Sequence, residues 1–354
     1  MSKFIDERLK SYTPYVPGEQ PKERKYIKLN TNESPFPPSA LALKLAREAA
    51  GDCELYPDPE YAALVDAAAE KFGLQKENLL FTNGSDEALQ YAFAAYCQNG
   101  KRAVFADITY GFYDVFADLY GANKKIVPLK EDFSICPAEY SRAGGTVFLA
   151  NPNAPTGKAL TKKEVLSIVT ENLDNVVVVD EAYIDFGGES VLPFVNDFDN
   201  LIVVRTFSKS RSLAGARVGF AAANKALIDD LKLIKYSSNP YNLSRMDAAA
   251  ALGALLDEAY FEKNRSTIIE NRETMTRRLE KIGFTVLPSR ANFIFARREG
   301  IPGKTLYSAL RERGILVRHF EKPRIADFLR ITVGNADECN ALVEALEAIV
   351  KETL

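Results

Sequence analysis

The chain has 354 residues, 45 of them basic and 48 acidic, which is long enough for about two domains with large hydrophobic cores. The near balance of charge and the lack of a basic stripe argue against nucleic-acid binding. With no long apolar run and no signal-peptide pattern, we expect a cytoplasmic protein without membrane contact. The single histidine, His319, excludes a multi-histidine metal site, and the four cysteines have no metal-binding or redox spacing.

The first part of the chain changes from irregular to regularly alternating. Residues 1–40 are rich in turns and proline, and a helical stretch at 41–50 and a proline-rich loop at 55–59 follow. The predicted strands cover 79–82, 103–105, 125–128, 146–150, 176–179, 201–204 and 217–221. The predicted helices between them cover 84–96, 112–120 and 162–170. This alternation predicts an α/β fold with a mostly parallel sheet sandwiched by helices.

The pattern changes near residue 240. Residues 243–282 are almost unbroken helix formers that end at Gly283, a typical helix stop. The remaining residues predict a smaller α+β module, with strands at 293–296, 315–317 and 329–332 and helices at 304–313 and 337–351. We therefore expect a large α/β domain over 41–255 and a small α+β domain over 256–354, joined by a long helix. The N-terminal arm, 1–40, should pack on the small domain or on a partner subunit.

Charged residues follow two β-branched runs. Val176–Val179 leads directly to Asp180, and Leu201–Val204 leads to Lys209, with Arg217 close behind. Taken singly, Lys209 reads as a solvated loop residue and Asp180 as a helix N-cap. Together, at strand ends where open α/β sheets bind ligands, they suit pyridoxal phosphate. A carboxylate pairs with its ring nitrogen, an amine forms the Schiff base and a guanidinium binds the phosphate.

Two further motifs would complete such a site. The turn Gly84-Ser85-Asp86 joins a strand to a helix, and a helix N-terminus can bind phosphate, although an ordinary capped helix has the same pattern. Thr206 and Ser208 would add hydroxyl donors. A flat cofactor also needs a stacked ring, for which Tyr110 is our candidate. For the neighbouring Phe112 and Tyr113 we favour core packing.

Two other segments are candidates for the walls of the site. The loop Asn151–Gly157 follows a strand, and its two prolines make it rigid. Arg330 lies within a strand-like run, where a buried guanidinium needs an anionic partner. A substrate carboxylate or phosphate would serve, bound through two hydrogen bonds, and an internal salt bridge is the alternative.

These motifs together resemble the fold-type I pyridoxal-phosphate aminotransferases, almost end to end. The segments that carry the resemblance are Thr31–Pro35, Tyr56–Pro59, Asn83–Glu87, Tyr110–Tyr113, Asn151–Gly157, Asp180–Tyr183, Thr206–Gly219, Pro240–Asn242, Ser289–Phe293 and Arg330–Gly334. The string from Ser208 to Gly219 is highly specific for the class. Tyr56–Pro59 and Asp180–Phe186 are similar to the histidinol-phosphate branch of the family.

The resemblance implies a pyridoxal-phosphate-dependent transaminase that interconverts histidinol phosphate and 2-oxoglutarate with imidazole acetol phosphate and glutamate. It implies that Lys209 is the Schiff-base lysine, that Asp180 pairs with the ring nitrogen and that Tyr183 bonds the phenolic oxygen. The other implied cofactor contacts are Gly84, Ser85, Asp86, Tyr110, Asn153, Thr206, Ser208, Arg217 and, from the neighbouring subunit of a homodimer with shared active sites, Tyr56. The implied substrate contacts are Tyr15, Asn32, Arg318 and Arg330.

The sequence departs from the family pattern at one position. Members usually have asparagine directly before Pro-Thr-Gly, where its side chain bonds the phenolic oxygen of the cofactor, and here that residue is Ala154. Tyr183 is then expected to be the main partner of that oxygen. An aromatic amino-acid aminotransferase or a threonine-phosphate decarboxylase would share the cofactor residues. A catalytically silent sensor of the same fold normally carries a DNA-binding domain, for which we expect no room before residue 40.

Overall fold

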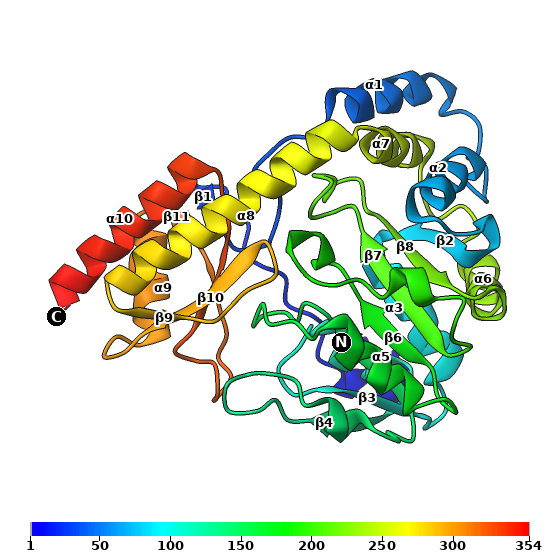
Figure 1. Ribbon diagram of the computed structural model, residues 1–354, viewed down its shortest axis with the longest axis horizontal. Coiled ribbons are helices and arrows are strands. Elements are labelled where there is room, and N and C mark those ends of the chain that lie inside the picture. Colours follow the sequence, from blue (N-terminus) through cyan, green and yellow to red (C-terminus); the bar gives the residue numbers. More distant parts are fainter. Residues whose placement is uncertain (1, 354) are drawn as a thin grey trace.

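A seven-stranded sheet forms the centre of the larger part of the molecule in the computed structural model, which describes residues 2–353 (Figure 1). Its strands are β2 (Leu79–Asn83), β3 (Arg102–Ala106), β4 (Asn123–Val127), β5 (Thr146–Ala150), β6 (Val177–Asp180), β7 (Leu201–Thr206) and β8 (Val218–Ala223). They lie in the order β2-β8-β7-β6-β5-β3-β4. All neighbouring pairs are parallel except those that β8 makes with β2 and β7. The predicted mostly parallel sheet is confirmed.

Helices cover both faces of this sheet. They are α2 (Ala62–Phe72), α3 (Gly84–Tyr96), α4 (Phe112–Leu119), α5 (Lys162–Thr170), α6 (Lys225–Ser238) and α7 (Arg245–Leu256), and α1 (Ala40–Ala49) packs on the outside of α7 (Figure 1). Successive side chains of a strand point to opposite faces, so Val177 and Val179 belong to one hydrophobic core and Val178 to the other. A run of consecutive valines suits a strand that is buried on both sides.

The predicted continuous helix over 243–282 is wrong, because the chain breaks at Asp257. This residue has φ −89° and ψ 69°, ends α7, and its side chain caps α8 (Glu258–Lys281) by accepting a hydrogen bond from Tyr260 N–H. The two helices have different packing partners. Helix α7 lies against α1, where Gly253 brings the backbones close together, whereas α8 runs toward the smaller part of the molecule (Figure 1).

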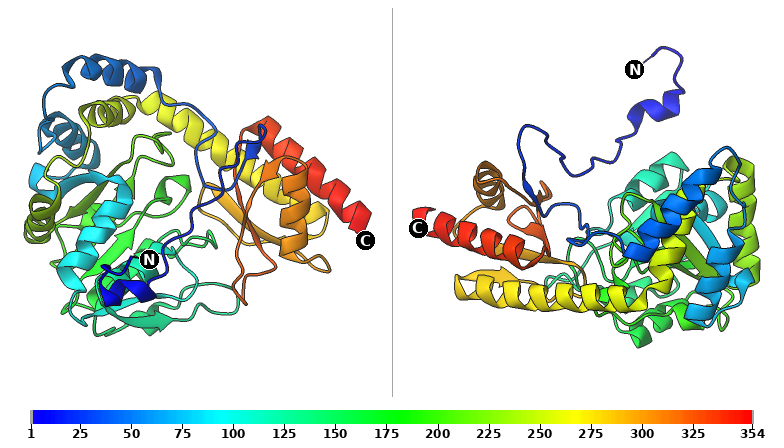
Figure 2. Two further views of the ribbon diagram at one scale, coloured as in Figure 1. Left: turned by 180° about the vertical axis from the view of Figure 1, so that it is seen from behind. Right: turned by 90° about the horizontal axis from the view of Figure 1, so that it is seen from above.

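The smaller part is built on a four-stranded antiparallel sheet with the order β12-β13-β10-β9. Its strands are β9 (Phe284–Val286), β10 (Phe293–Arg298), β12 (Arg318–His319) and β13 (Leu329–Thr332). Helices α8, α9 (Gly303–Glu312) and α10 (Ala336–Thr353) pack around a third hydrophobic core there. The arm joins this part through β1 (Ile27–Lys28), which pairs in parallel with β11 (Ile315–Leu316). The N-terminal end of the arm reaches away from the body (Figure 2).

Candidate active site

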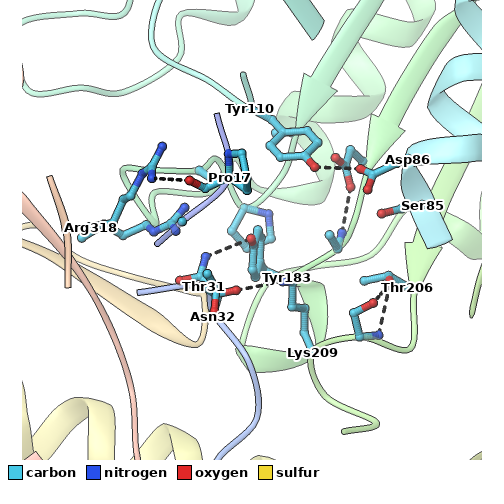
Figure 3. A pocket seen from close by; sticks show the side chains of 18 of the residues that line it. Pro17, Thr31, Asn32, Ser85, Asp86, Tyr110, Tyr183, Thr206, Lys209 and Arg318 are labelled. Carbon is cyan, nitrogen blue, oxygen red and sulfur yellow. Dashed lines mark hydrogen bonds between the residues drawn. The ribbon is translucent and has the colours of Figure 1, made fainter. Parts of the chain in front are cut away.

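A cavity of about 220 Å³ lies where the C-terminal ends of β5, β6 and β7 face the N-terminal arm and β13 (Figure 3). All but three of the side chains predicted for the site line it. Those present are Tyr15, Asn32, Ser85, Asp86, Tyr110, Asp180, Tyr183, Thr206, Ser208, Lys209, Arg217, Arg318 and Arg330. Strand ends, a helix start and a strand of the smaller sheet thus contribute to one site.

Lys209 follows β7 and extends into this cavity. Its Nζ donates to the carbonyl oxygen of Thr31 at 3.4 Å and lies 5.8 Å from the centre of the Tyr183 ring. Burial, together with the positive charge of Arg330, lowers the pKa of Lys209 to about 8. A substantial fraction of this amine is therefore neutral under mildly alkaline conditions. Only the neutral amine is a nucleophile or a general base.

Asp180 is the last residue of β6 and is buried beneath the cavity. Its carboxylate accepts hydrogen bonds from Ala182 N–H at 3.0 Å and from the Tyr113 hydroxyl at 3.2 Å. Burial raises the pKa of Asp180 to about 6, because these two hydrogen bonds replace only part of its hydration. A cationic N–H in the cavity would restore the charged form of this carboxylate.

The turn at the start of α3 lies at the end of the cavity opposite Arg318 (Figure 3). Gly84 has φ 72°, and a Cβ at this position would lie 2.5 Å from Arg217 Nη2. A Cβ on Gly219 would lie 2.5 Å from Ser85 N, so β8 also packs its backbone against the turn. Arg217 Nη2 reaches Asp86 Oδ2 at 3.1 Å. The free N–H groups of the first helical turn and this guanidinium make a place for a dianion.

Two arginines lie at the side of the cavity formed by the smaller sheet and the arm. Arg330 on β13 donates from Nη2 to the carbonyl oxygen of Asn30 at 2.9 Å, while its buried Nε has no hydrogen-bond partner in the described part of the chain. Arg330 forms no ion pair with another residue of 2–353, so the internal salt bridge considered for it is absent there. Arg318 donates to the carbonyl oxygens of Pro17 and Val16, which ties the arm to the cavity.

Aromatic side chains enclose the cavity on the arm side. Tyr110 donates from its hydroxyl to Asp86 Oδ1 at 2.7 Å, and Tyr15 stacks on Phe112 with ring centres 4.3 Å apart. Phe112 packs against the second hydrophobic core, as expected, and its ring also contacts the arm through Tyr15. Tyr113 is buried in the core, also as expected, yet its hydroxyl holds Asp180. The sequence shows that a tyrosine stands there but not where its hydroxyl points, so this residue was missed.

Three of the predicted site residues do not line the cavity. Gly84 lies in the turn behind Ser85. The Asn153 side chain donates to the carbonyl oxygen of Ile108 and accepts from the Thr109 hydroxyl, so it supports the loop that carries Tyr110. Tyr56 is 78% exposed and stacks on Tyr241 with ring centres 4.6 Å apart. The cofactor contacts predicted for these residues stay predictions.

Residues 24–346 match the family model described as aminotransferase class I and II. The chain belongs to this family. The similarity to two curated relatives covers almost the full length of this chain and of each relative. Histidinol-phosphate aminotransferase 1 of Bordetella parapertussis is 50% identical over 353 residues, covering 99% of this chain and 99% of the relative. Histidinol-phosphate aminotransferase 2 of Rhizobium meliloti is 50% identical over 351 residues, covering 99% of this chain and 100% of the relative.

Solved structures show the same aminotransferase architecture. The histidinol-phosphate aminotransferase of Sinorhizobium meliloti, solved in complex with pyridoxal-5'-phosphate, has a TM-score of 0.90 at 25% identity. The match covers 100% of this chain and 99% of the other. The threonine-phosphate decarboxylase of Porphyromonas gingivalis reaches a TM-score of 0.78 at 23% identity, covering 92% of this chain and 99% of the other. Both reactions therefore occur on this fold, which alone does not distinguish between them.

The aminotransferase cavity fits pyridoxal phosphate in three respects. Asp180 is a buried carboxylate that needs a cationic partner, which the pyridinium N–H provides. The turn at Gly84 and Arg217 provides donors for a phosphate. Lys209, with its lowered pKa, lines the same cavity. Within residues 2–353 no cluster of three or more histidine, cysteine, aspartate or glutamate side chains is arranged to hold a metal ion. Over the same residues, no helix has the length and apolar character needed to cross a membrane.

Proposed function

We propose that this aminotransferase interconverts histidinol phosphate and 2-oxoglutarate with imidazole acetol phosphate and glutamate, a step of histidine biosynthesis. The observation that carries the proposal is Arg330, a partly buried guanidinium that has no acidic partner within residues 2–353 and lines the same cavity as Lys209. Such a group is suited to a substrate anion. The full-length relatives at 50% identity, both named histidinol-phosphate aminotransferases, support the choice of substrate.

The residues of the cavity have distinct tasks in this reaction. Pyridoxal phosphate, when bound, supplies a reactive carbonyl carbon and a ring that accepts electron density. Asp180 keeps a proton on the ring nitrogen that pairs with it. Lys209 Nζ, once neutral, takes the proton from the substrate carbon that bears the amino group. The Tyr183 hydroxyl donates a hydrogen bond to an oxygen anion in the cavity and keeps its proton.

The two substrates have different anionic groups. Glutamate has carboxylates, whereas histidinol phosphate has a phosphate and no carboxylate, so one pocket must accept both kinds of anion. The planar guanidinium of Arg330 can form two parallel hydrogen bonds with either group. Arg318 adds a second positive charge to the same cavity, although its donors also hold the arm.

We also infer a homodimer with shared active sites, working in the cytoplasm. Tyr56 and Tyr241 are stacked on each other, and both are exposed, as are Leu55 beside Tyr56 and Met246 and Leu256 on α7. Exposed apolar side chains of this kind suit a subunit interface.

We further infer the division into a large domain over 41–255 and a small domain over 256–354, which is consistent with the break at Asp257.

A paired assay tests the proposed substrate. The protein is incubated with 2-oxoglutarate and either histidinol phosphate, phenylalanine or tyrosine, and glutamate formation is measured, while a separate incubation with threonine phosphate is assayed for released carbon dioxide. We expect the highest kcat/KM for histidinol phosphate and no carbon dioxide. Lys209→Ala is the control and should abolish glutamate formation. A preference for phenylalanine or tyrosine would instead assign the chain to aromatic aminotransferases.

Subunit mixing tests the shared site. Tyr56→Ala and Lys209→Ala should each be inactive or nearly so, because each removes one contact from every site of its homodimer. Hybrid dimers would contain one site with both residues intact, so mixing under conditions of subunit exchange should restore part of the activity. Hybrid dimers that form but remain inactive would refute the contribution of Tyr56 to the neighbouring site.

A further inference from the structure

The hydroxyl of Tyr183 has one side-chain hydrogen bond within residues 2–353. Asn32 Nδ2 donates to Tyr183 Oη at 3.0 Å, and the two residues lie next to each other in the cavity (Figure 3). The rest of the Tyr183 side chain is in apolar contact, edge-on to Phe293 with ring centres 5.1 Å apart and packed near Ala154. The hydrogen bonding of this phenol therefore depends on Asn32.

A second set of contacts fixes the direction of the Asn32 amide. Asn32 is buried, and its left-handed backbone has φ 56°. Its N–H donates to Thr332 Oγ1 at 2.9 Å, and Thr332 Oγ1 donates its own proton to Asn32 Oδ1 at 3.1 Å. A threonine hydroxyl has a single proton, so these two bonds place the amide oxygen toward Thr332. The amide NH₂ then faces Tyr183, and in this orientation every hydrogen bond of the Asn32 amide joins a donor to an acceptor.

We propose that Asn32, oriented by Thr332, is a positioning residue that acts through Tyr183 and turns the phenolic proton into the cavity. An amide NH₂ donates but does not accept, so Tyr183 cannot give its proton back to Asn32. The proton is then free for an acceptor on the Lys209 side, which is the phenolic oxygen of pyridoxal phosphate when the cofactor is bound. This inference rests on the cofactor assignment made above and gives Asn32 a role other than the predicted substrate contact.

The electrostatic surroundings agree with this arrangement. Burial raises the pKa of Tyr183, while the charge of Arg330 and the hydrogen bond from Asn32 act against that rise. Tyr183 therefore keeps its proton at neutral pH and remains a donor. A hydroxyl that accepts one hydrogen bond becomes a stronger donor in the next, because the two bonds polarise each other.

Near-isosteric substitutions test the direction of the proton. Asn32→Asp replaces the donor by an acceptor, so Tyr183 would donate to the new carboxylate and away from the cavity. Thr332→Val keeps the shape of the side chain but removes the hydroxyl that orients the amide, and it adds no charge. Thr332→Ser keeps the hydroxyl and is the matched control. Tyr183→Phe removes the group through which Asn32 is proposed to act.

The measurement is the pH midpoint at which the visible absorption of the pyridoxal-phosphate-loaded protein changes, together with the affinity for pyridoxal phosphate. A donor to the phenolic oxygen stabilises its anionic form and lowers this midpoint. We expect Asn32→Asp to raise the midpoint by about 1–2 pH units, as for one lost charged hydrogen bond. Thr332→Val should raise it by less, and Thr332→Ser should match the parent. In the Tyr183→Phe background, neither Asn32→Asp nor Thr332→Val should shift it further.

Two results would overturn the inference. Unshifted midpoints in Asn32→Asp and Thr332→Val, with cofactor bound, would show that Asn32 does not orient the proton. An equal shift from Asn32→Asp in the Tyr183→Phe background would show that the added charge acts directly. If Asn32→Asp fails to fold, the comparison of Thr332→Val with Thr332→Ser decides. A parent protein that forms no visible band with pyridoxal phosphate would overturn the cofactor assignment and this inference with it.

Discussion

At the scale of single residues, burial determines the chemistry of the cavity more than net charge does. The same loss of hydration lowers the pKa of Lys209 to about 8 and raises that of Asp180 to about 6, so both groups move toward their neutral forms. Each then gains from a cofactor that supplies the missing partner. This is why neither group, considered without its surroundings, indicates what the site does.

The first prediction concerns the cost of burying Lys209 in the cofactor-free protein. Its folded pKa is about 8 and its ordinary value is 10.5, so the unfolded chain binds more protons between these two pH values. The unfolding free energy therefore rises with pH in this window, and below pH 8 the full cost is present. We expect Lys209→Met to stabilise the protein at pH 7 by roughly 2 kcal/mol, allowing for the water that reaches the side chain.

Urea unfolding of the cofactor-free proteins at pH 7 and pH 10 checks this prediction. The gain from Lys209→Met should shrink at pH 10, because the folded parent then carries a neutral lysine and no longer bears most of the cost of burying the charge. Lys163→Met, at an exposed position of α5, is the control and should leave the pH dependence of the parent unchanged. An equal gain from Lys209→Met at both pH values would contradict the assigned cause.

The sequence predicted which residues stand at strand ends, but not their contacts with distant parts of the chain. Asp180 and Lys209 could be placed because their own flanking residues form strands. The bond from Tyr113 to Asp180 joins residues 67 positions apart, and that from Asn32 to Tyr183 joins residues 151 apart. Only the folded chain brings these side chains together, so their roles could not be read from local patterns.

At the scale of elements, the periodicity of apolar residues predicted the strands but not the ends of helices that are set by close packing between backbones. Apolar runs placed the strands of the large sheet to within about two residues, because strands buried on both faces have a distinct composition. Helices α2 and α6 were not predicted. The break between α7 and α8 was missed because both flanking segments favour helix, and the change of packing partner at Asp257 is a tertiary effect.

The second prediction tests the contact between α1 and α7. A Cβ on Gly253 would lie 2.6 Å from Ala42 Cα and 2.7 Å from Ala42 N, which are backbone atoms that cannot rotate away. Gly253→Ala should therefore destabilise the protein by about 1–3 kcal/mol, despite the better helix propensity of alanine. The control is Gly51→Ala, where a Cβ has no neighbour within 4 Å. Thermal unfolding of both variants measures the difference, and equal melting temperatures would mean that the helices separate at little cost.

At the scale of the whole molecule, a loop of the smaller part is hydrogen-bonded to the larger part beside the active site. Arg324, between β12 and β13, donates from Nη1 to Asp107 Oδ2 at 2.8 Å. Its Nη2 donates to the carbonyl oxygens of Leu129 and Lys130, at 3.0 and 2.7 Å. Phe133 packs edge-on against Phe328 at the same place, with ring centres 5.4 Å apart. No motif in the sequence marked Arg324, because its partners are about 200 residues away.

The third prediction concerns these contacts of Arg324. Arg324→Ala removes one ion pair and two hydrogen bonds to backbone carbonyl oxygens that join the two parts of the molecule. This should weaken their closed arrangement by about 1–2 kcal/mol, since the ion pair is partly exposed to water. Residues 129–133 should then exchange their amide hydrogens several-fold faster, because local opening becomes easier. Arg313→Ala is the matched control, since Arg313 pairs with Glu352 inside the smaller part. Hydrogen exchange followed by mass spectrometry measures both variants. Unchanged exchange at 129–133 in Arg324→Ala would show that apolar contacts such as Phe133 with Phe328 hold the parts together without the arginine.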